Sequence, residues 1–310
     1  MINSILTITL NPTVDKSTSV ENIKPEKKLR CSPPKYEPGG GGINVSRGLV
    51  RLGIENTALF TAGGRTGERL IELLKEEKVA TSPIKVSAET RENFIVVDTL
   101  HNEQYRFGMP GDSITPEEND TILKKILALS PTPEVAVISG SLPPGVSTAF
   151  IGEITRALKD KGTKIIADTS GDALQEILKE GIFLLKPNLG ELSNLTGIEE
   201  LDNELADDAA MKLINEGKAE VIVVSLGPQG AHLVTKTDNV HIPAPSVKKL
   251  STVGAGDSMV AGMVYGIVKG YSSLDIARMG VACGSAATMN PGTGLFKPQD
   301  AERLFSWLCK

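Results

Sequence analysis

The sequence predicts an α/β protein with a mainly parallel sheet and helices on both faces of that sheet. Short, almost continuously apolar runs have the character of buried parallel strands. They alternate along the chain with amphipathic helical patterns, and this alternation is typical of βαβ units. The predicted strands are Ile5–Leu10, Val135–Ile138, Lys164–Ala167, Phe183–Leu185 and Val221–Val224.

The predicted helices carry apolar residues spaced to form one face. Val45, Leu49 and Leu52 recur at i, i+4 and i+7, which places them on one side of a helix. Thr115-Pro116-Glu117-Glu118 predicts a capping box with proline at the first helical position, opening a helix that continues to about Leu129. Similar spacing is found in Leu70, Leu73 and Leu74 and in Ile151, Ile154 and Leu158.

Two segments interrupt this alternation. Residues 15–38 have no helical period and contain four prolines and a basic stretch. Within residues 91–110, Phe94–Thr99 and Gln104–Phe107 are predicted strands around a His101-Asn102 turn. Strands inserted between α/β units usually form a small separate sheet, so we predict a β-sheet lid made by these two segments. A surface hairpin without a role fits the pattern equally well. We expect a single domain over residues 1–310.

Composition and charge exclude several classes of protein. The 310 residues are 40% hydrophobic, enough for a substantial core, and the net charge of −5 argues against a nucleic-acid partner. No run of 18 apolar residues exists, and no basic segment precedes the short apolar run at the start. We therefore expect no membrane contact and a cytoplasmic location. Cys31, Cys283 and Cys309 lack paired spacing, which fits reduced thiols.

A run of four glycines leads directly into the first amphipathic helix. Gly39–Gly42 allow the backbone to approach a ligand closely, and the following helix start offers unpaired N–H groups. Asn44 could then reach a sugar hydroxyl with either end of its amide. A flexible loop before a helix is the alternative. Dinucleotide and P-loop sites are excluded, because no G-x-G-x-x-G follows the first strand and Gly140–Gly145 lacks the Lys-Ser/Thr pair.

Three further motifs carry residues suited to chemistry. Gly254–Ser258 precedes a strongly apolar helix, so its N–H groups can bind an anion while Asp257 takes a proton; an ordinary acidic N-cap is the alternative. Asn188 and Glu191 follow a strand and could hold a hydrated Mg²⁺, or simply start a helix. Ser225–Gly230 ends the next strand and could lie along a nucleotide, or form a plain hairpin turn.

Together, and in this order, these motifs resemble the PfkB branch of the ribokinase-like sugar kinases. The glycine run with Asn44 matches the N-terminal signature of that family, Thr252–Asp257 its C-terminal signature, and Asn188 with Glu191 its N-x-x-E motif. The resemblance spans nearly the whole chain and is stronger to the 6-phosphofructokinase branch, through Lys28–Cys31, Gln104–Phe107 and Ser139–Gly145. One departure is Ser251-Thr252-Val253, where many members have an Asp and two Thr; it bears on monovalent-ion binding more than on activity.

The resemblance implies a fold, a reaction and partners. It implies a three-layer α/β/α ribokinase-like fold with a small β-sheet lid, often paired with another lid in a homodimer. The implied reaction transfers the γ-phosphoryl group of ATP to O1 of fructose 6-phosphate, giving fructose 1,6-bisphosphate. Tagatose 6-phosphate and fructose 1-phosphate are alternative substrates, and a sugar-phosphate sensor without activity is the alternative from another class.

The resemblance also implies a role for individual residues. Asp257 would be the base, and the N–H groups of Gly254, Ala255, Gly256 and Asp257 the anion hole. Lys28 would reach the neighbouring site across a dimer. Implied substrate-binding residues are Asp15, Lys28, Gly40, Gly41, Gly42, Asn44, Arg91, Arg106 and Ser141. Implied nucleotide-binding residues are Lys186, Asn188, Ser225, Leu226, Gly227, Pro228, Gln229 and Gly230. Glu191 would bind Mg²⁺, and a K⁺ site would use Ser251, Val253, Ala287, Asn290, Gly292 and Gly294.

Overall fold

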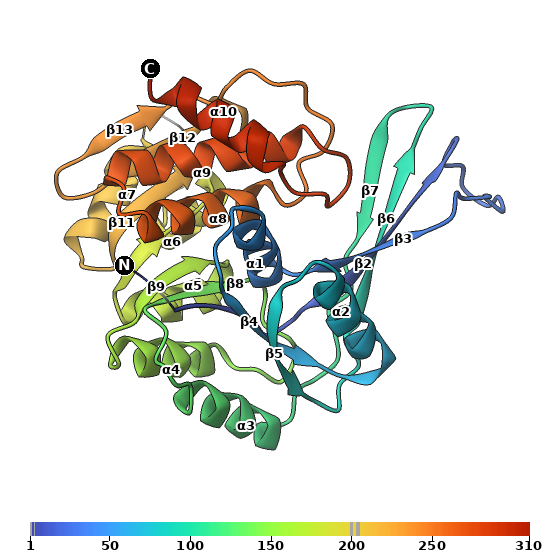
Figure 1. Ribbon diagram of the computed structural model, residues 1–310, viewed down its shortest axis with the longest axis horizontal. Helices are drawn as coiled ribbons and strands as arrows, with labels where there is room; N and C mark the ends of the chain where they lie inside the picture. Colours follow the sequence, from blue (N-terminus) through green and yellow to red (C-terminus); the bar gives the residue numbers. More distant parts are fainter. Residues whose placement is uncertain (1, 3, 199–200, 203–204) are drawn as a thin grey trace.

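The computed structural model describes residues 2, 4–198, 201–202 and 205–310, and a mainly parallel sheet runs through its centre (Figure 1). In these residues the sheet has nine strands in the order β13-β12-β11-β10-β9-β8-β1-β4-β5. Neighbouring strands pair in parallel along the row β5-β4-β1-β8-β9-β10-β11. Strand β12 pairs antiparallel with both β11 and β13. Their bounds are β1 Ile5–Thr9, β4 Thr57–Ala62, β5 Ala80–Lys85, β8 Val135–Ser139, β9 Lys164–Asp168, β10 Ile182–Leu185, β11 Ala219–Ser225, β12 Ala231–Val234 and β13 Asn239–Ile242.

Helices cover both faces of this sheet, as the sequence predicts. One face carries α3 Pro116–Leu127, α4 Thr148–Lys159, α5 Gly171–Lys179, α6 Leu189–Thr196 and α7 Ala206–Asn215. The other carries α1 Gly41–Arg51, α8 Ala255–Val268, α9 Ser273–Thr288 and α10 Pro298–Leu308. Helix α2, Gly64–Glu76, packs beside α1 over β4. The predicted capping box is confirmed at the start of α3, where the Glu118 backbone N–H donates to Thr115 Oγ1.

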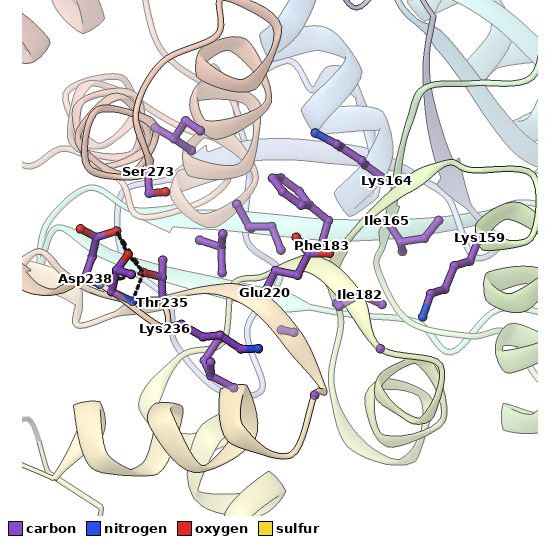
Figure 2. Close-up of a pocket in the computed structure, with 18 of the residues that line it drawn as sticks. Lys159, Lys164, Ile165, Ile182, Phe183, Glu220, Thr235, Lys236, Asp238 and Ser273 are labelled. Carbon is purple, nitrogen blue, oxygen red and sulfur yellow. Dashed lines mark hydrogen bonds between the residues drawn. The ribbon is translucent and has the colours of Figure 1, made fainter.

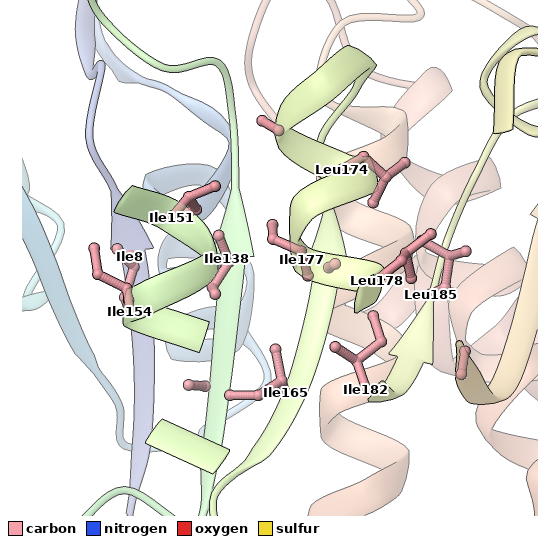
Figure 3. Packing of buried hydrophobic residues seen from close by; sticks show 14 of the residues in the cluster. Ile8, Ile138, Ile151, Ile154, Ile165, Leu174, Ile177, Leu178, Ile182 and Leu185 are labelled. Carbon is pink, nitrogen blue, oxygen red and sulfur yellow. The ribbon is translucent and has the colours of Figure 1, made fainter. Parts of the chain in front are cut away.

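The alternation of strand residues divides the apolar core into two layers. In β8, Val135 and Val137 join the core under α1 and α8, whereas Ile138 joins the core under α4 and α5. Figure 3 shows this second layer, in which the Ile151 and Ile177 side chains lie over the strands. Central strands such as β1 and β8 are buried on both faces and need continuous apolar runs, and this is why they were predictable. The edge strands β5 and β13 are partly exposed and were not predicted.

Four strands form a second, smaller sheet that projects from the main body (Figure 1). They are β2 Thr13–Val20, β3 Lys35–Gly39, β6 Arg91–Asp98 and β7 Glu103–Phe107, and among the described residues they pair in the order β3-β2-β6-β7. The prediction of a separate small sheet is therefore confirmed. Strands β2 and β3 were not predicted as strands, because a sheet with one exposed face needs no continuous apolar run. The parallel pairing of Thr13 with Arg91 joins the two inserted segments.

Two further properties concern membrane-spanning helices and the cysteines. No helix in the described part of the chain is long and apolar enough to cross a membrane. The three cysteines are free thiols: Cys31 and Cys309 are exposed, and Cys283 is buried.

Candidate active site

A pocket of about 330 Å³ lies where β1, β8 and β9 end, between the main sheet and the small sheet. Ligand clefts of α/β proteins form at this edge, because the carboxyl ends of parallel strands meet there. The pocket brings together eight predicted residues: Asp15, Gly40, Gly41, Asn44, Arg91, Ser141, Glu191 and Asp257. Five lining residues were not singled out from the sequence: Thr13, Asn93, Asp168, Thr169 and Ser170. Two more, Ser139 and Gly140, belong to a motif that carried the resemblance but were not predicted as site residues.

Asp257 lies in the first turn of α8 and faces this pocket. Helix α8 is capped by Gly254, with φ of 73° and no side-chain cap bond, so the alternative of Asp257 as an N-cap is wrong. One carboxylate oxygen, Oδ2, accepts a hydrogen bond from Asn44 Nδ2 at 2.8 Å. Burial and the neighbouring Asp168 raise the pKa of Asp257 from 3.8 to about 7, against the opposing effects of Asn44 and Lys186. Such a carboxylate is matched to proton transfer near neutral pH.

The glycine run is required by close packing, so the alternative of a merely flexible loop is wrong. Gly40 has φ of 109°, which favours glycine, and a Cβ on Gly41 would lie 2.1 Å from Ser139 Oγ. Gly42 does not line the pocket but lies against β1, where a Cβ would be 2.5 Å from Thr9 Oγ1. The backbone at the start of α1 is thereby held against the ends of β1 and β8.

Both ends of the Asn44 amide are held by protein groups, which corrects the expectation that either end is free to bind a hydroxyl. Asn44 Nδ2 donates to Asp257, and Asn44 Oδ1 accepts from Arg47 Nη1 at 2.9 Å. Arg47 lies one turn further along α1 and was not singled out from the sequence. The spacing of three residues on one helix was the available signal.

An ion pair between Lys186 and Asp168 lies beside Asp257. Lys186 Nζ is 3.0 Å from Asp168 Oδ1, and the Lys186 side chain is buried. Burial disfavours the ammonium, but Asp168, with Glu191 and Asp257, outweighs this and raises the pKa of Lys186. A Cβ on Gly256 would lie 3.6 Å from Lys186 Nζ, so the ammonium faces the predicted anion hole. The site can therefore bind negative charge between a lysine and backbone N–H groups.

Asn188 and Glu191 form a capping box, as their alternative interpretation predicted, and Glu191 also lines the pocket. Asn188 Oδ1 accepts from the Glu191 backbone N–H at 2.9 Å, and Glu191 Oε2 accepts from the Asn188 N–H at 2.9 Å. Burial raises the pKa of Glu191. The described residues contain no group of three His, Cys, Asp or Glu placed to bind a metal. One or two carboxylates that leave room for water and phosphate ligands fit Mg²⁺.

Arg91 and Asp15 face each other across the small-sheet side of the pocket. Arg91 Nη1 donates to the Met109 carbonyl at 2.7 Å, and Arg91 Nη2 donates to the Asn11 carbonyl at 3.0 Å. Asp15 Oδ1 accepts from Asn93 Nδ2 at 3.0 Å, and burial raises the pKa of Asp15. A guanidinium has five N–H donors, so Arg91 keeps donors for an anion in the pocket.

Lys28 and Arg106 lie outside this pocket. Lys28 is exposed in the connection between β2 and β3, and Arg106 is exposed on β7. Within one chain, neither is among the lining residues.

The predicted nucleotide-binding residues lie next to the Asn188 turn. The Ser225 backbone N–H donates to the Pro187 carbonyl at 2.8 Å, which places the ends of β10 and β11 together. Residues 225–230 connect β11 to the antiparallel β12 through a 3₁₀ turn at Gly227–Gln229, so they form the hairpin that was the alternative. A hairpin at this edge of the sheet is still placed to contact a ligand that extends from the pocket.

The predicted cation-binding residues also form one cluster, although three of their carbonyls have protein partners in the described part of the chain. The Ala287 carbonyl accepts from the Asn290 backbone N–H at 3.1 Å. Ser251 Oγ donates to the Gly292 carbonyl at 3.0 Å, which links the loop before α8 to the loop after α9. The Gly294 carbonyl accepts a hydrogen bond from Arg51 Nη1. Each carbonyl has a second lone pair, so these bonds leave an acceptor site on each oxygen.

A larger hollow of about 850 Å³ lies at the opposite edge of the sheet (Figure 2). It is lined by the first residues of β9, β10 and β11, together with the Lys159, Lys236 and Asp238 side chains. None of the predicted site residues lines this hollow. Its size alone does not make it the functional site, because Asp15, Glu191 and Asp257, whose pKa values are raised by burial, line the smaller pocket.

Comparison with known proteins identifies the family of this chain. Residues 2–300 match the pfkB family carbohydrate kinases. This chain belongs to the pfkB family. It is 43% identical to the ATP-dependent 6-phosphofructokinase isozyme 2 of Escherichia coli K12 over 307 residues, which cover 99% of each protein. It is 34% identical to the 1-phosphofructokinase of Bacillus subtilis 168 over 94% of each.

A solved structure shows the same family relationship in three dimensions. The crystal structure of Escherichia coli phosphofructokinase-2 in complex with potassium superposes with a TM-score of 0.96 at 42% identity, covering 100% of both chains. The ribokinase-like fold predicted from the motifs is therefore confirmed, including the small sheet.

Proposed function

We propose that this kinase transfers the γ-phosphoryl group of ATP to O1 of fructose 6-phosphate. The observation that carries the proposal is the placement of Asp257. Its carboxylate lies beside the first N–H groups of α8, faces a pocket of about 330 Å³, and has a pKa raised to about 7. The 43% identity to a 6-phosphofructokinase supports the substrate.

The proposed reaction uses Asp257 as a base and the start of α8 as an anion hole. Asp257 accepts the O1 proton as O1 attacks the γ-phosphorus, the bond to the bridging oxygen of ADP breaks, and ADP leaves. The N–H groups of Gly254 to Asp257, together with Lys186, stabilise the charge on the transferred group. Phosphoryl transfer depends mainly on positioning and charge stabilisation, so no covalent intermediate is needed.

Magnesium and the nucleotide are assigned to the side of the pocket where β10 and β11 end. Glu191 would hold Mg²⁺, with Asn188 as a partner and phosphate oxygens and water as the other ligands; the ion would neutralise charge on the phosphates. The adenosine part of ATP would lie along Ser225–Gly230. Potassium would bind in the cluster of Ser251 and the loop 287–294, and replacing K⁺ by Na⁺ in the assay tests this.

The sugar phosphate is assigned to the small-sheet side. Asp15 and the backbone at Gly40 and Gly41 would bind hydroxyls, and Arg91 would bind the 6-phosphate. The exposed apolar side chains of the small sheet, among them Leu100, Tyr105, Phe107 and Met109, support a homodimer formed through this sheet. Lys28 would then reach the site of the partner subunit. Sedimentation of a Phe107→Asp variant tests the dimer, which the substitution is expected to dissociate.

Product analysis across three sugar phosphates tests the proposed substrate. The purified protein is given ATP with fructose 6-phosphate, tagatose 6-phosphate or fructose 1-phosphate, and the highest kcat/KM is expected for fructose 6-phosphate. A higher value for either other sugar would establish one of the alternative kinase activities. A sensor would form no ADP in response to any of them. We also place the enzyme in the cytoplasm, where its free thiols remain reduced.

A further inference from the structure

We propose that Arg47 is a positioning residue for this reaction: it holds the amide oxygen of Asn44 and thereby directs the amide nitrogen toward the carboxylate of Asp257. The inference rests on the proposed function, because it takes Asp257 as the base. Arg47 is 1% exposed and is among the largest fully buried side chains of the described residues. A buried cation is costly unless its donors are used, so its partners indicate its role.

The hydrogen-bonding capacity of the guanidinium fixes the orientation of the amide. Arg47 Nη1 donates to Asn44 Oδ1 at 2.9 Å and to the Pro38 carbonyl at 2.8 Å. A guanidinium only donates, so the amide oxygen must face Arg47. The amide nitrogen must then face Asp257, and it donates to Asp257 Oδ2 at 2.8 Å. A rotated amide would place its oxygen against the carboxylate, which is repulsive.

The other side of the guanidinium is held by Glu77, the residue that follows α2. Arg47 Nε donates to Glu77 Oε2 at 2.8 Å, and Arg47 Nη2 donates to Glu77 Oε1 at 2.7 Å. These two parallel bonds fix the plane of the guanidinium. Arg51, one turn further along α1, lies 3.9 Å from Glu77 Oε2 and donates to the Phe296 carbonyl at 3.0 Å. Glu77 therefore anchors α1 from outside the pocket.

The Asn44 bond acts on the ionisation of Asp257 against two neighbouring carboxylates. Asp168 at the end of β9 and Asp15 on β2 disfavour a charged Asp257, whereas Lys186 after β10 and Asn44 on α1 favour it. Glu191 on α6 acts through Lys186. If Arg47 no longer holds the amide, Asp257 loses a donor to its charged form and its pKa rises. The base is then protonated up to a higher pH, so the acidic limb of kcat moves upward.

Glu77→Gln and Arg47→Lys test this inference. Glu77 has a side chain that is 29% exposed, so replacing its charge need not disrupt the core. We measure kcat between pH 5.5 and 9 at saturating substrates. In both variants we expect kcat at pH 7 to fall by about 3- to 10-fold and the acidic limb to move up by roughly 0.5–1 pH unit, with KM for ATP unchanged.

Glu180→Gln is the matched control. It breaks a comparable two-bond pair, in which Arg156 Nε donates to Glu180 Oε2 at 3.1 Å and Arg156 Nη2 donates to Oε1 at 2.6 Å, away from the pocket. A purely structural loss would lower the unfolding temperature of either variant without moving the pH profile. We expect the control to keep the parental profile.

A double variant tests whether the effect of Glu77 on Asp257 passes through the Asn44 amide. In an Asn44→Ala background, adding Glu77→Gln should move the acidic limb no further, because the bond that transmits the effect is already absent. A Glu77→Gln variant that is folded at the assay temperature and has parental kcat and pH profile overturns the inference, as does an equal shift in both backgrounds. If Arg47→Lys fails to fold, Glu77→Gln alone decides.

Failure of the proposed function would look different. It would be seen in the parental protein, as ADP formation that no sugar phosphate stimulates, or as an active Asp257→Asn variant. An active parent with an inactive Asp257→Asn variant, combined with an unchanged Glu77→Gln variant, refutes the inference alone.

Discussion

Asp257→Asn separates the chemical role of the carboxylate from its structural role. The amide is nearly the same size as the carboxyl group, and helix α8 is capped by Gly254 rather than by this side chain, so the fold should be kept. Without a base, turnover should fall by about 10²–10⁴-fold, the usual contribution of general-base catalysis. Binding of fructose 6-phosphate should be retained, which calorimetry on the inactive variant can measure.

The pH dependence follows from the sign of the pKa shift. Asp257 must be ionised to accept a proton, and its pKa is raised from 3.8 to about 7. The parental kcat should therefore rise about tenfold per pH unit below pH 7 and level off above it. The Asp257→Asn variant should lose this slope.

The same shift predicts the effect of the substitution on stability. A carboxyl group with a raised pKa in the folded state stabilises the fold while it is protonated, and this contribution is lost as the pH rises from about 4 through about 7. A tenfold change in an ionisation constant is worth about 1.4 kcal/mol. Because part of Asp257 still faces the pocket, we take the cost of ionising it as about 2–4 kcal/mol. Asp257→Asn avoids this cost.

Unfolding in urea at pH 5 and pH 8 measures this difference. The gain in stability of Asp257→Asn over the parent should be larger at pH 8 than at pH 5 by about 1–3 kcal/mol, because pH 5 is already above the unfolded pKa of 3.8 and part of the cost is present at both pH values. Near-normal turnover of the variant would remove Asp257 from the mechanism. A parental kcat that does not change between pH 5.5 and 8 would refute the raised pKa as the origin of the acidic limb.

Three further substitutions test other parts of the site. Arg91→Ala should raise the KM for fructose 6-phosphate by about 10- to 100-fold, as expected for a lost charge-assisted contact, and leave the KM for ATP nearly unchanged; an unchanged sugar KM in initial-rate assays would contradict this. Gly256→Ala places a Cβ 3.6 Å from Lys186 Nζ, an ordinary contact, so we expect a folded protein whose kcat is lower by about 10²–10³-fold. Gly152→Ala on α4, with its nearest contact at 3.7 Å, is the control and should keep full activity. Glu191→Gln should raise the Mg²⁺ concentration for half-maximal rate by about 10-fold, and an unchanged Mg²⁺ titration would exclude Glu191 as a ligand.

The sequence predicted those parts of the fold that are determined locally. Strands such as β8 are buried on both faces and appear as apolar runs, and the α3 capping box is complete within four residues. Strand β2 was missed because it is stabilised by pairing with β6, about 78 residues away in the chain for Asp15 and Asn93. A pattern within one segment carries no information about such pairing.

The charges around the candidate site also depend on contacts between distant segments, which the sequence does not reveal. The motif residues Asp257 and Glu191 could be found because each lies in a short signature. Asp168 could not, because its role comes from the parallel pairing of β9 with β10, which places it 3.0 Å from Lys186. The raised pKa of Asp257 depends on that neighbour, so the property that suits it to proton transfer is created by the sheet and not by the motif.

The balance of charge around Asp257 explains why buried cations accompany the motif. Asp15 and Asp168 both disfavour its ionisation, so a site with these carboxylates alone would keep the base protonated. Lys186 compensates directly, whereas Arg47 acts through the amide of Asn44, which is neutral and therefore supplies a donor without adding a charge to the pocket. This arrangement leaves the pKa near the working pH. A second cation in direct contact would lower that pKa further and make Asp257 a weaker base.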